Sequence, residues 1–345
     1  MIELKHGQVL ILNQQQCKQL IREEEVPQLM EDVLRDFSNG EVINPLKTHV
    51  PFYSQYNSYL NAMPCWLKNR NVAGIKWAGS GEDNPRTIGF PQSVATLILN
   101  DPETALPLAF MDSTYIMALR TGAVAAVMAK YCCKKGTKVM TIIGAGVQGT
   151  SAFRMTMLTM PQIEEVRVVD INPAAIERFI DQGTTQYPNV KFVPCEDLQS
   201  SVRGADLIIP AAHSAGSSGS GILDDIELDK GTTIVGISGG LSLAKVRQRC
   251  DRSILDYIKC FVYRINATRG YMKELYGIDV EEVDESVADC EIGDVIAGKA
   301  PGRVNDEEIV HAAGVGMGIE DVIVADVIYR RALEQDIGLV VDVIN

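Results

Sequence analysis

A glycine-rich turn between two apolar segments is the feature that most constrains how this chain folds. The apolar run 139–143 leads directly into the turn 144–149, an amphipathic segment follows, and a second apolar run, 166–169, ends at Asp170. This order of strand, Gly-x-Gly-x-x-Gly, helix, strand and acid is typical of the βαβ unit that binds a dinucleotide. The alternative is a glycine-rich turn in an α/β fold that carries no ligand.

Each residue type in the turn has a physical role in nucleotide binding. Gly144 permits a tight turn, Gly146 lets the backbone approach a pyrophosphate, and Gly149 lets the helix pack close to the strand. The amides at the start of the helix, and the positive end of its dipole, attract phosphate groups. We predict that the following residues contact the cofactor: Gly144, Ala145, Gly146, Val147, Gln148, Gly149, Asp170 and Ile171.

The acid at the end of the second strand also predicts which dinucleotide binds. The Asp170 carboxylate can accept hydrogen bonds from the ribose hydroxyls. It repels a 2′-phosphate, and residues 171–177 contain no Arg or Lys that would neutralise one. NAD (NADH) is therefore the expected cofactor, and NADP is disfavoured.

The charge balance limits the partners of the chain. Its 345 residues contain 32 Lys and Arg and 45 Asp and Glu, a formal net charge of −13, which disfavours nucleic acid and anionic membrane surfaces. No apolar run reaches the roughly 18–20 residues that a membrane helix needs. The first residues, MIELKHGQ, do not resemble a signal peptide. We expect a cytoplasmic protein with neither nucleic acid nor a membrane as a partner.

The placement of cysteine and histidine gives no sign of a disulfide framework or a metal site. The eight cysteines are scattered without a C-x-x-C pair, and the four histidines lie far apart in the sequence. We therefore expect free thiols and no bound metal.

The first third of the chain consists of short apolar or alternating runs separated by turn residues. This pattern predicts an α+β unit with an antiparallel sheet. The predicted strands are 9–12, 48–53, 58–63, 72–77, 94–100 and 106–110, and the predicted helices are 14–21 and 26–37. A long apolar helix, 114–135, follows.

From residue 138 to about 260, apolar strands alternate with helical segments, which predicts a doubly wound parallel sheet. The strands are expected near 139–143, 166–170, 190–193, 206–210, 232–237 and 253–256. Further on, 292–297, 306–313 and 319–333 are predicted helices, and 339–343 is a predicted strand. We predict an α/β protein in which a Rossmann domain, 119–317, is inserted in an α+β domain formed by 1–118 together with 318–345.

Two lysines are candidate ligand contacts in this first domain. Lys47 follows Asn-Pro in a loop, where a solvated lysine is an equally good interpretation. Lys76 lies inside a predicted strand, where it either faces a site or points harmlessly outward.

Arg120 is the strongest candidate. It is the only charged residue of the segment 113–129, whose other members are mostly apolar or small. A buried guanidinium needs a partner, which is either a structural carboxylate or a bound anionic substrate. We favour the substrate, because arginine grips a carboxylate with two parallel hydrogen bonds. Thr121, Gly122 and Ala123 are small enough to leave room for it.

His213 follows the predicted strand 206–210 and opens a Gly/Ser-rich loop. The carboxyl ends of strands in a doubly wound sheet face the ligand crevice. His213 therefore either contacts the nucleotide or is a surface loop histidine.

Several motifs resemble the ornithine cyclodeaminase and mu-crystallin family. They are MDST (111–114), ALRTGA (118–123), IGAGVQG (143–149), AGKAPGR (297–303) and DEEI (306–309). The last two are similar to the family's Gly-Lys-x-Pro-Gly-Arg segment. The order and spacing of the motifs cover almost the whole chain.

The resemblance implies a homodimer in which both chain ends form a substrate-binding and dimerisation domain and the Rossmann domain binds NAD. It implies an activity on the carbon–nitrogen bond of a small amino or imino (ketimine) acid. Lys76 and Arg120 match the lysine and arginine that hold the α-carboxylate in the family. Lys47 stands where the family has a further arginine, so the charge is kept but the planar fork is lost.

Two positions depart from the cyclodeaminase pattern. The family's aspartate after the fifth Rossmann strand is replaced by Ser238 or its neighbour, and we expect Ser238 near the cofactor. The family's Ser-Thr-Gly before the last helix becomes Gly314-Val315-Gly316, which alters the expected nicotinamide surroundings. The missing aspartate argues against ornithine cyclisation.

We therefore expect an NAD(H)-dependent amino acid dehydrogenase or imine reductase. Lys76 and Arg120 are its expected catalytic residues, and Lys47 and Thr121 join them in binding the substrate. Burial beside Arg120 is expected to lower the pKa of Lys76 and let it exchange a proton with the substrate nitrogen or with water. Two alternatives stay open: an ornithine cyclodeaminase that uses NAD without net turnover, and a non-catalytic nucleotide-binding protein like mu-crystallin.

Overall fold

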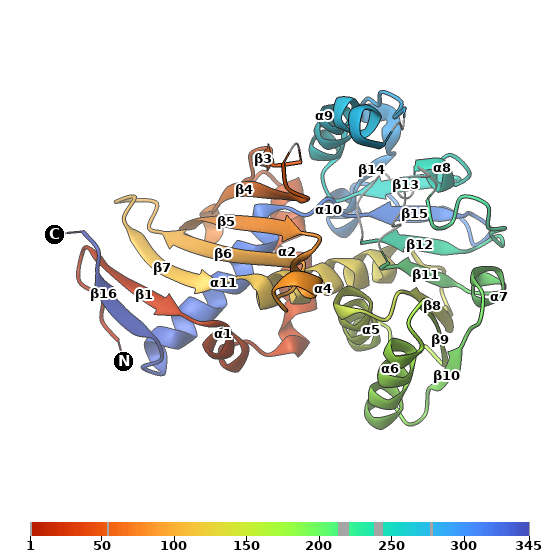
Figure 1. Cartoon of the computed structure of the whole chain (residues 1–345), viewed down its shortest axis with the longest axis horizontal. Helices are drawn as coiled ribbons and strands as arrows, with labels where there is room; N and C mark the ends of the chain where they lie inside the picture. The colour runs from red at the N-terminus through yellow and green to blue at the C-terminus, as the bar shows by residue number, and fades with distance from the viewer. Residues whose placement is uncertain (1, 54, 213–220, 238–243, 277–278, 345) are drawn as a thin grey trace. The chain divides into compact units, whose positions relative to one another are not determined.

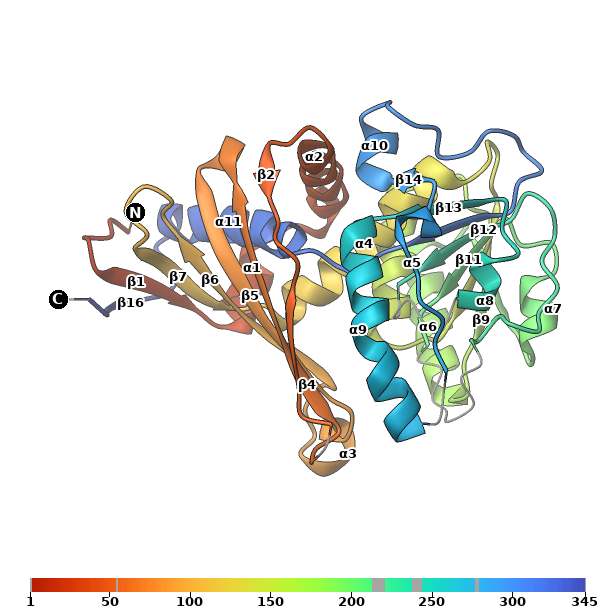
Figure 2. The same ribbon diagram turned by 90° about the horizontal axis from the view of Figure 1, so that it is seen from above.

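The computed structural model describes residues 2–53, 55–212, 221–237, 244–276 and 279–344. The chain divides into two compact units, one formed by Met1–Arg120 with Met317–Asn345 and the other by Thr121–Gly316. Figures 1 and 2 show the elements of each unit. Both ends of the chain contribute to the first unit, and the middle of the chain forms the second.

The first unit contains an eight-stranded sheet. Its strands are β1 (Gln8–Leu12), β2 (Val42–Ile43), β3 (Thr48–Pro51), β4 (Ser58–Leu67), β5 (Val72–Gly81), β6 (Ser93–Asn100), β7 (Pro107–Asp112) and β16 (Leu339–Asp342). They lie in the order β16-β1-β7-β6-β5-β4-β2, and β3 pairs with β4. The predicted strands of this region are all present, with β4 and β5 extending further than expected.

The prediction of an antiparallel sheet was wrong at one pair of strands. The neighbours β4, β5, β6 and β7 pair antiparallel, but β1 pairs with β7 in parallel. The start of the chain supplies β1, and no hairpin joins it to β7, so no turn fixes its direction. At the edge, β16 pairs antiparallel with β1 and brings the end of the chain beside its beginning.

Helix α11 (Gly318–Glu334) covers one face of this sheet (Figures 1 and 2). It packs on β4, β5 and β6, and β5 alternates between buried and less buried residues, as expected when one face is covered. Gly74 permits this close packing, because a Cβ there would lie 3.0 Å from Val322 Cγ2. The other helices that lie within this unit are α1 (Gln14–Leu20), α2 (Val26–Ser38) and α3 (Asn84–Thr87).

The second unit contains an eight-stranded parallel sheet of the Rossmann type, which confirms the predicted fold class. The strands are β8 (Val139–Ile143), β9 (Glu165–Val169), β10 (Lys191–Pro194), β11 (Leu207–Pro210), β12 (Thr233–Gly236), β13 (Arg252–Leu255), β14 (Cys290–Glu291) and β15 (Val310–Ala313). Their order is β10-β9-β8-β11-β12-β15-β13-β14. The helices are α4 (Thr114–Cys132, which begins in the first unit), α5 (Val147–Thr159), α6 (Pro173–Gln186), α7 (Leu198–Val202), α8 (Ala244–Arg247), α9 (Ile258–Tyr276) and α10 (Ile292–Ile296).

The predicted helix 306–313 was wrong. Its second half is strand β15, which pairs in parallel with β12 on one side and β13 on the other. All four residues of β15 are buried. A short apolar run does not by itself distinguish a buried strand from a buried helix, and here the two neighbouring strands provide the hydrogen bonds that decide it.

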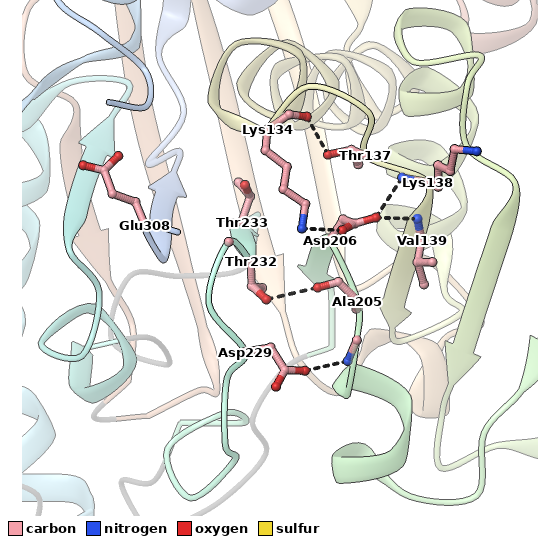
Figure 3. A network of polar contacts seen from close by, with 12 residues as sticks. Lys134, Thr137, Lys138, Val139, Ala205, Asp206, Asp229, Thr232, Thr233 and Glu308 are labelled. Carbon is pink, nitrogen blue, oxygen red and sulfur yellow. Dashed lines mark hydrogen bonds and ion pairs between the residues drawn. The ribbon is translucent and has the colours of Figure 1, made fainter. Parts of the chain in front are cut away.

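A half-buried carboxylate connects the amino ends of two central strands with the residues that follow α4 (Figure 3). Asp206, the residue before β11, accepts hydrogen bonds from the amides of Lys138 and Val139 at 2.8 and 3.0 Å. Its carboxylate also pairs with Lys134 Nζ at 2.8 Å. Burial acts to raise the pKa of Asp206, but the hydrogen bonds from Lys134 and the two amides bring it below its usual value.

The segment 297–303, one of the family-like motifs, lies at this same end of the sheet. Arg303 donates hydrogen bonds to the Cys132 carbonyl at 3.0 Å and to Thr233 Oγ1 at 2.9 Å. Gly302 permits the contact with α4, because a Cβ there would lie 2.2 Å from the Tyr131 carbonyl oxygen. The segment thus fixes the last turn of α4 to the sheet, which is a structural role.

No helix in the described parts of the chain combines the length and the apolar character that crossing a membrane requires.

His311 is buried in the middle of the parallel sheet. Its Nδ1 lies 3.2 Å from Ser253 Oγ, and its Nε2 has no hydrogen-bond partner among the described residues. Burial, with a smaller contribution from Arg247, lowers the pKa of His311 from 6.5 to about 4. The unfolded chain therefore takes up a proton near pH 6.5 that the folded chain accepts only near pH 4.

We predict that His311 makes the folded state less stable as the pH falls from 6.5 to 4. The slope attributable to this residue is at most about 1.4 kcal/mol per pH unit. His311→Asn should remove that slope from the pH dependence of the free energy of unfolding in urea. The exposed His6 provides the control, since His6→Asn should leave the slope unchanged. Equal slopes in wild type and His311→Asn would contradict the prediction.

Candidate active site

The glycine turn has the backbone geometry that the sequence predicts. Gly144 has a φ of 98°, and a Cβ at Gly149 would lie 1.9 Å from the Gly144 carbonyl oxygen. Gly146 caps the amino end of α5, and a Cβ there would meet no atom within 4 Å. Gly144 and Gly149 therefore permit the tight packing of the turn, and Gly146 faces open space in front of α5.

Asp170 lies beside this turn at the carboxyl end of β9. Its carboxylate accepts hydrogen bonds from the Ala145 amide at 2.7 Å and from the Asn172 amide at 2.8 Å. Ile171 and Val147 are both largely exposed. The structure thus brings together the predicted residues of the turn and of β9. His213 and Ser238 lie outside the described residues.

In the first unit, Lys76 and Asp321 form a buried ion pair. Lys76 Nζ lies 2.6 Å from Asp321 Oδ2, and Lys76 is only 1% exposed. Lys76 is on the covered face of β5, and Asp321 is in the first turn of α11. The interpretation of Lys76 as an outward-facing strand lysine is therefore wrong.

Arg120 extends this pair into a group of four charges. Its Nη1 lies 2.6 Å from Glu320 Oε2, and its Nε lies 3.3 Å from Asp321 Oδ1. Arg120 is 8% exposed, and both carboxylates are fully buried. The sequence left two kinds of partner open for Arg120, a structural carboxylate and a bound anionic substrate. In the structure, Glu320 and Asp321 are structural carboxylate partners. Asp321 contacts both cations, so the four formal charges balance.

Burial, together with the neighbouring charge of Arg120, lowers the pKa of Lys76 from 10.5 to about 8, although Asp321 and Glu320 act in the opposite direction. A lysine with a pKa near neutral pH can give up and regain a proton during a reaction. This arrangement therefore places a lysine that can exchange a proton beside a guanidinium held by two carboxylates.

Glu320 and Asp321 were not predicted from the sequence. A signal was present, because they are the only acidic residues between Glu308 and Asp326, at the start of an otherwise apolar helix. The same reasoning that singled out Arg120 applies to them, since a buried acid also needs a partner.

Lys47 and the residues after Arg120 also differ from expectation. Lys47 is 9% exposed, so the solvated-loop interpretation is wrong. Gly122 leaves no room for a ligand, because a Cβ there would lie 2.4 Å from Ser151 Oγ. The missing side chain serves the close packing of α4 on α5. Thr121 is partly exposed.

The described residues include no group of three or more His, Cys, Asp or Glu side chains arranged to hold a metal ion.

The sequence profile of the ornithine cyclodeaminase/mu-crystallin family matches residues 8–336. The chain belongs to this family. Among curated members, it is 30% identical to the N-((2S)-2-amino-2-carboxyethyl)-L-glutamate dehydrogenase of Staphylococcus aureus, over 89% of this chain and 90% of that protein. The family resemblance of the motifs is therefore confirmed.

Solved structures of family members have the same fold. The Δ1-pyrroline-2-carboxylate reductase of Thermococcus litoralis, solved with NADH and L-proline, has a TM-score of 0.82 at 28% identity and covers 96% of this chain and 99% of its own. An archaeal alanine dehydrogenase dimer with bound NAD has a TM-score of 0.81 at 27% identity, covering 97% and 99%.

We predict that Asp321→Asn destabilises the protein by about 3 kcal/mol or more. The change leaves Lys76 and Arg120 buried with one carboxylate between them, and an uncompensated buried charge is costly. Urea unfolding measures the loss. Adding Lys76→Met to Asp321→Asn should restore part of the stability, because it removes the uncompensated cation.

The partly exposed pair Asp32–Arg35 provides the control. Asp32→Asn should cost at most about 1 kcal/mol, as expected for a solvated ion pair. If Asp321→Asn proves no more destabilising than Asp32→Asn, the buried pair is not a major contribution to stability.

Proposed function

We propose that this protein is an NAD(H)-dependent oxidoreductase acting on the C–N bond of a small amino or imino (ketimine) acid. The observation that carries the proposal is the buried group of Lys76, Arg120, Glu320 and Asp321, which places a lysine of lowered pKa beside an arginine. The relatives support it, because their names describe an N-substituted glutamate dehydrogenase and a pyrroline-2-carboxylate reductase. Both reactions exchange a hydride at a carbon bonded to nitrogen.

The glycine turn fits NAD(H). The open space at Gly146 suits a pyrophosphate, which the first amides of α5 would bind. Gln148 Oε1 is buried in the turn without a hydrogen-bond partner among the described residues. The Asp170 carboxylate is placed to accept hydrogen bonds from the ribose hydroxyls. We propose His213 and Ser238 as further cofactor contacts.

Bound NADH would supply the hydride for the reaction imino acid + NADH + H⁺ → amino acid + NAD⁺. Arg120 would bind the α-carboxylate of the substrate, and Lys47 and Thr121 would contribute to the same site. Lys76 would deliver the proton that the substrate nitrogen needs, because its lowered pKa lets it release one near neutral pH. Asp321 would hold Lys76 in place for this transfer and help to restore its proton afterwards.

We predict that the protein oxidises NADH in the presence of an imino acid and prefers NADH to NADPH. Lys76→Met should lower kcat/KM by about 100-fold or more, because it removes the proton donor. In the reductive direction, kcat/KM of the wild type should fall as the pH rises above about 8, where Lys76 loses its proton. Nicotinamide absorbance, followed with NADH and NADPH at a series of pH values, measures the cofactor preference, the effect of Lys76→Met and the pH dependence.

NADH fluorescence separates a catalytic defect from a folding defect in this assay. A Lys76→Met variant that still binds NADH but does not turn over supports the assignment. A wild type that oxidises NADH with none of pyruvate plus ammonia, pyrroline-2-carboxylate or other cyclic imines would refute the proposed activity.

We also propose that the protein works as a homodimer through the uncovered face of the first unit's sheet. Neighbouring residues on this face form one apolar row across six strands: Pro64, Ile75, Ile98, Phe110, Ile11 and Leu339. Phe110 is 40% exposed, and Trp77 lies on the same face. A continuous apolar surface of this kind marks an association site, and the archaeal alanine dehydrogenase is a dimer.

We predict that the wild type has the mass of a dimer by light scattering after size exclusion and that Phe110→Glu shifts it towards the monomer. A charge at the centre of an apolar interface must be desolvated without a partner. Ile88→Glu is the control, because Ile88 is exposed on α3's flanking loop, outside this row. A monomeric wild type, or equal dissociation of both variants, would contradict the prediction.

We propose a cytoplasmic location. All eight cysteines are free, as is usual in a reducing compartment.

A further inference from the structure

The start of helix α11 determines where two of the four buried charges lie. Glu320 and Asp321 are in its first turn. Their carboxylates lie 2.6 Å from Arg120 and Lys76, respectively. The hydrogen-bonded backbone makes a helix a stiff element, so a carboxylate in the first turn moves with the first residues of the helix. These contacts therefore depend on what holds the amino end of α11 in place.

A distant asparagine caps this helix. The first amides of a helix have no partner within the helix, and the residue before it often supplies a side-chain acceptor. Met317, which stands in this position, makes no such hydrogen bond within the described part of the chain. Instead, Asn44 Oδ1 accepts a hydrogen bond from the Ile319 amide at 3.3 Å, across 275 residues of sequence. Asn44 is only 9% exposed, so the cap is buried.

The sheet of the first unit holds Asn44 in turn. Asn44 directly follows β2, which pairs with the end of β4. The start of α11 also packs on β4, because a Cβ at Gly318 would lie 2.5 Å from the Met63 carbonyl oxygen. Met63 is directly opposite Lys76. The packing at Gly318 sets how closely the helix approaches the sheet, whereas the hydrogen bond from Asn44 is directional and also sets its orientation.

Asn44 also connects the start of α11 to the segment that contains Lys47. Pro45 has a fixed φ and favours an extended backbone at Asn44, which makes this short segment stiff. Lys47 follows three residues after Asn44 and is buried. It is a substrate contact in the proposed function. One side chain thus joins a substrate-binding segment to the helix that carries the two acids.

We propose that Asn44 is a positioning residue of the site: its cap on α11 holds Asp321 against Lys76 and joins the Lys47 segment to the same helix start. This inference rests on the proposed function and adds a residue that acts through Asp321. Without the cap, the Ile319 amide would be buried without a partner, which is costly. The first turn of α11 would shift to satisfy it, and Asp321 would lie further from Lys76.

A displaced Asp321 changes the proton affinity of Lys76 in a defined direction. Burial and Arg120 lower the pKa of Lys76, while Asp321 and Glu320 raise it. Cys65 of β4 also lies near this pair, but burial raises its pKa and keeps it uncharged. A weaker contact with Asp321 therefore lowers the pKa of Lys76 further. Because the reductive reaction needs protonated Lys76, the alkaline fall of kcat/KM should begin at a lower pH.

The test is a pair of substitutions at Asn44, assayed with NADH and the best imino acid substrate of the wild type. Asn44→Leu removes the acceptor and should lower kcat about 10-fold or more, because misplaced reacting groups lose at least this much. It should also move the alkaline limb of the kcat/KM profile down by about half a pH unit or more. Asn44→Asp keeps the acceptor and should restore kcat. Its limb should lie no lower than that of the wild type, because the added charge favours protonated Lys76.

Asn13→Leu is the matched control. Asn13 caps α1 in the same unit by accepting a hydrogen bond from the Gln16 amide at 3.0 Å, and α1 carries none of the four buried charges. This change removes a cap of the same kind and should leave kcat and the pH limb unchanged. The positioning role is refuted if Asn44→Leu, like Asn13→Leu, loses only stability in urea, or if Asn44→Asp does not restore kcat.

A further variant keeps the test decisive if Asn44→Leu does not fold. Asn44→Gln retains the amide but displaces its acceptor by one methylene group. It should lower kcat and move the pH limb in the same direction as Asn44→Leu. Wild-type kcat and an unchanged limb in Asn44→Gln would refute the inference.

A measurement without turnover separates this inference from the proposed reaction. In protein that carries carbon-13 lysine, NMR titration of the Lys76 Cε resonance, assigned with Lys76→Met, reports the pKa of Lys76 directly. Asn44→Leu should lower this pKa, and Asn13→Leu should not. If the wild type reduces no imino acid but this shift is found, the proposed function fails and the positioning role stands. If the wild type is active and the pKa of Lys76 is the same in Asn44→Leu, the positioning role is refuted.

Discussion

The burial of two cations against two adjacent carboxylates is the interaction on which the first unit depends. Lys76 comes from the middle of a sheet strand, Arg120 from the first turns of α4, and Glu320 with Asp321 from the start of α11. Each charge alone would be costly to remove from water. These charges are buried together only because residues about 200 to 245 positions apart in sequence meet in the fold. Electrostatics thus gives a reason for the return of the chain's last helix to its first sheet.

The glycine turn in the second unit depends on a different constraint. Its geometry is steric, since a side chain at Gly149 would collide with the backbone at Gly144. Such a constraint involves residues close in sequence, so it can be recognised from the sequence alone. The first unit is therefore organised around a non-local charge cluster, and the second around a local steric motif.

Patterns among residues close in sequence predicted most of the fold and two of the four charged residues of the cluster, Lys76 and Arg120. The glycine spacing and the alternating apolar runs predicted the Rossmann sheet, and Arg120 was recognisable as the only charge in an apolar helix. Asp321 was missed because its role depends on a partner far away in sequence. The strand Val310–Ala313 was predicted as a helix, since its neighbours β12 and β13 supply hydrogen bonds that the sequence does not display. The missing side chain of Gly122 was interpreted as room for a ligand, but Ser151 fills that space.

The sequence by itself determined the family, the fold class and the residue types that suit NAD binding, because these follow from short-range spacing and steric demands. The tertiary structure decided which groups meet. It showed that Lys76 faces inward and that two acids neutralise the two cations. These facts depend on strand register and on where α11 begins, and both are set by packing between distant segments. Neither the strand register nor the start of α11 can be inferred from neighbouring residues in the sequence alone.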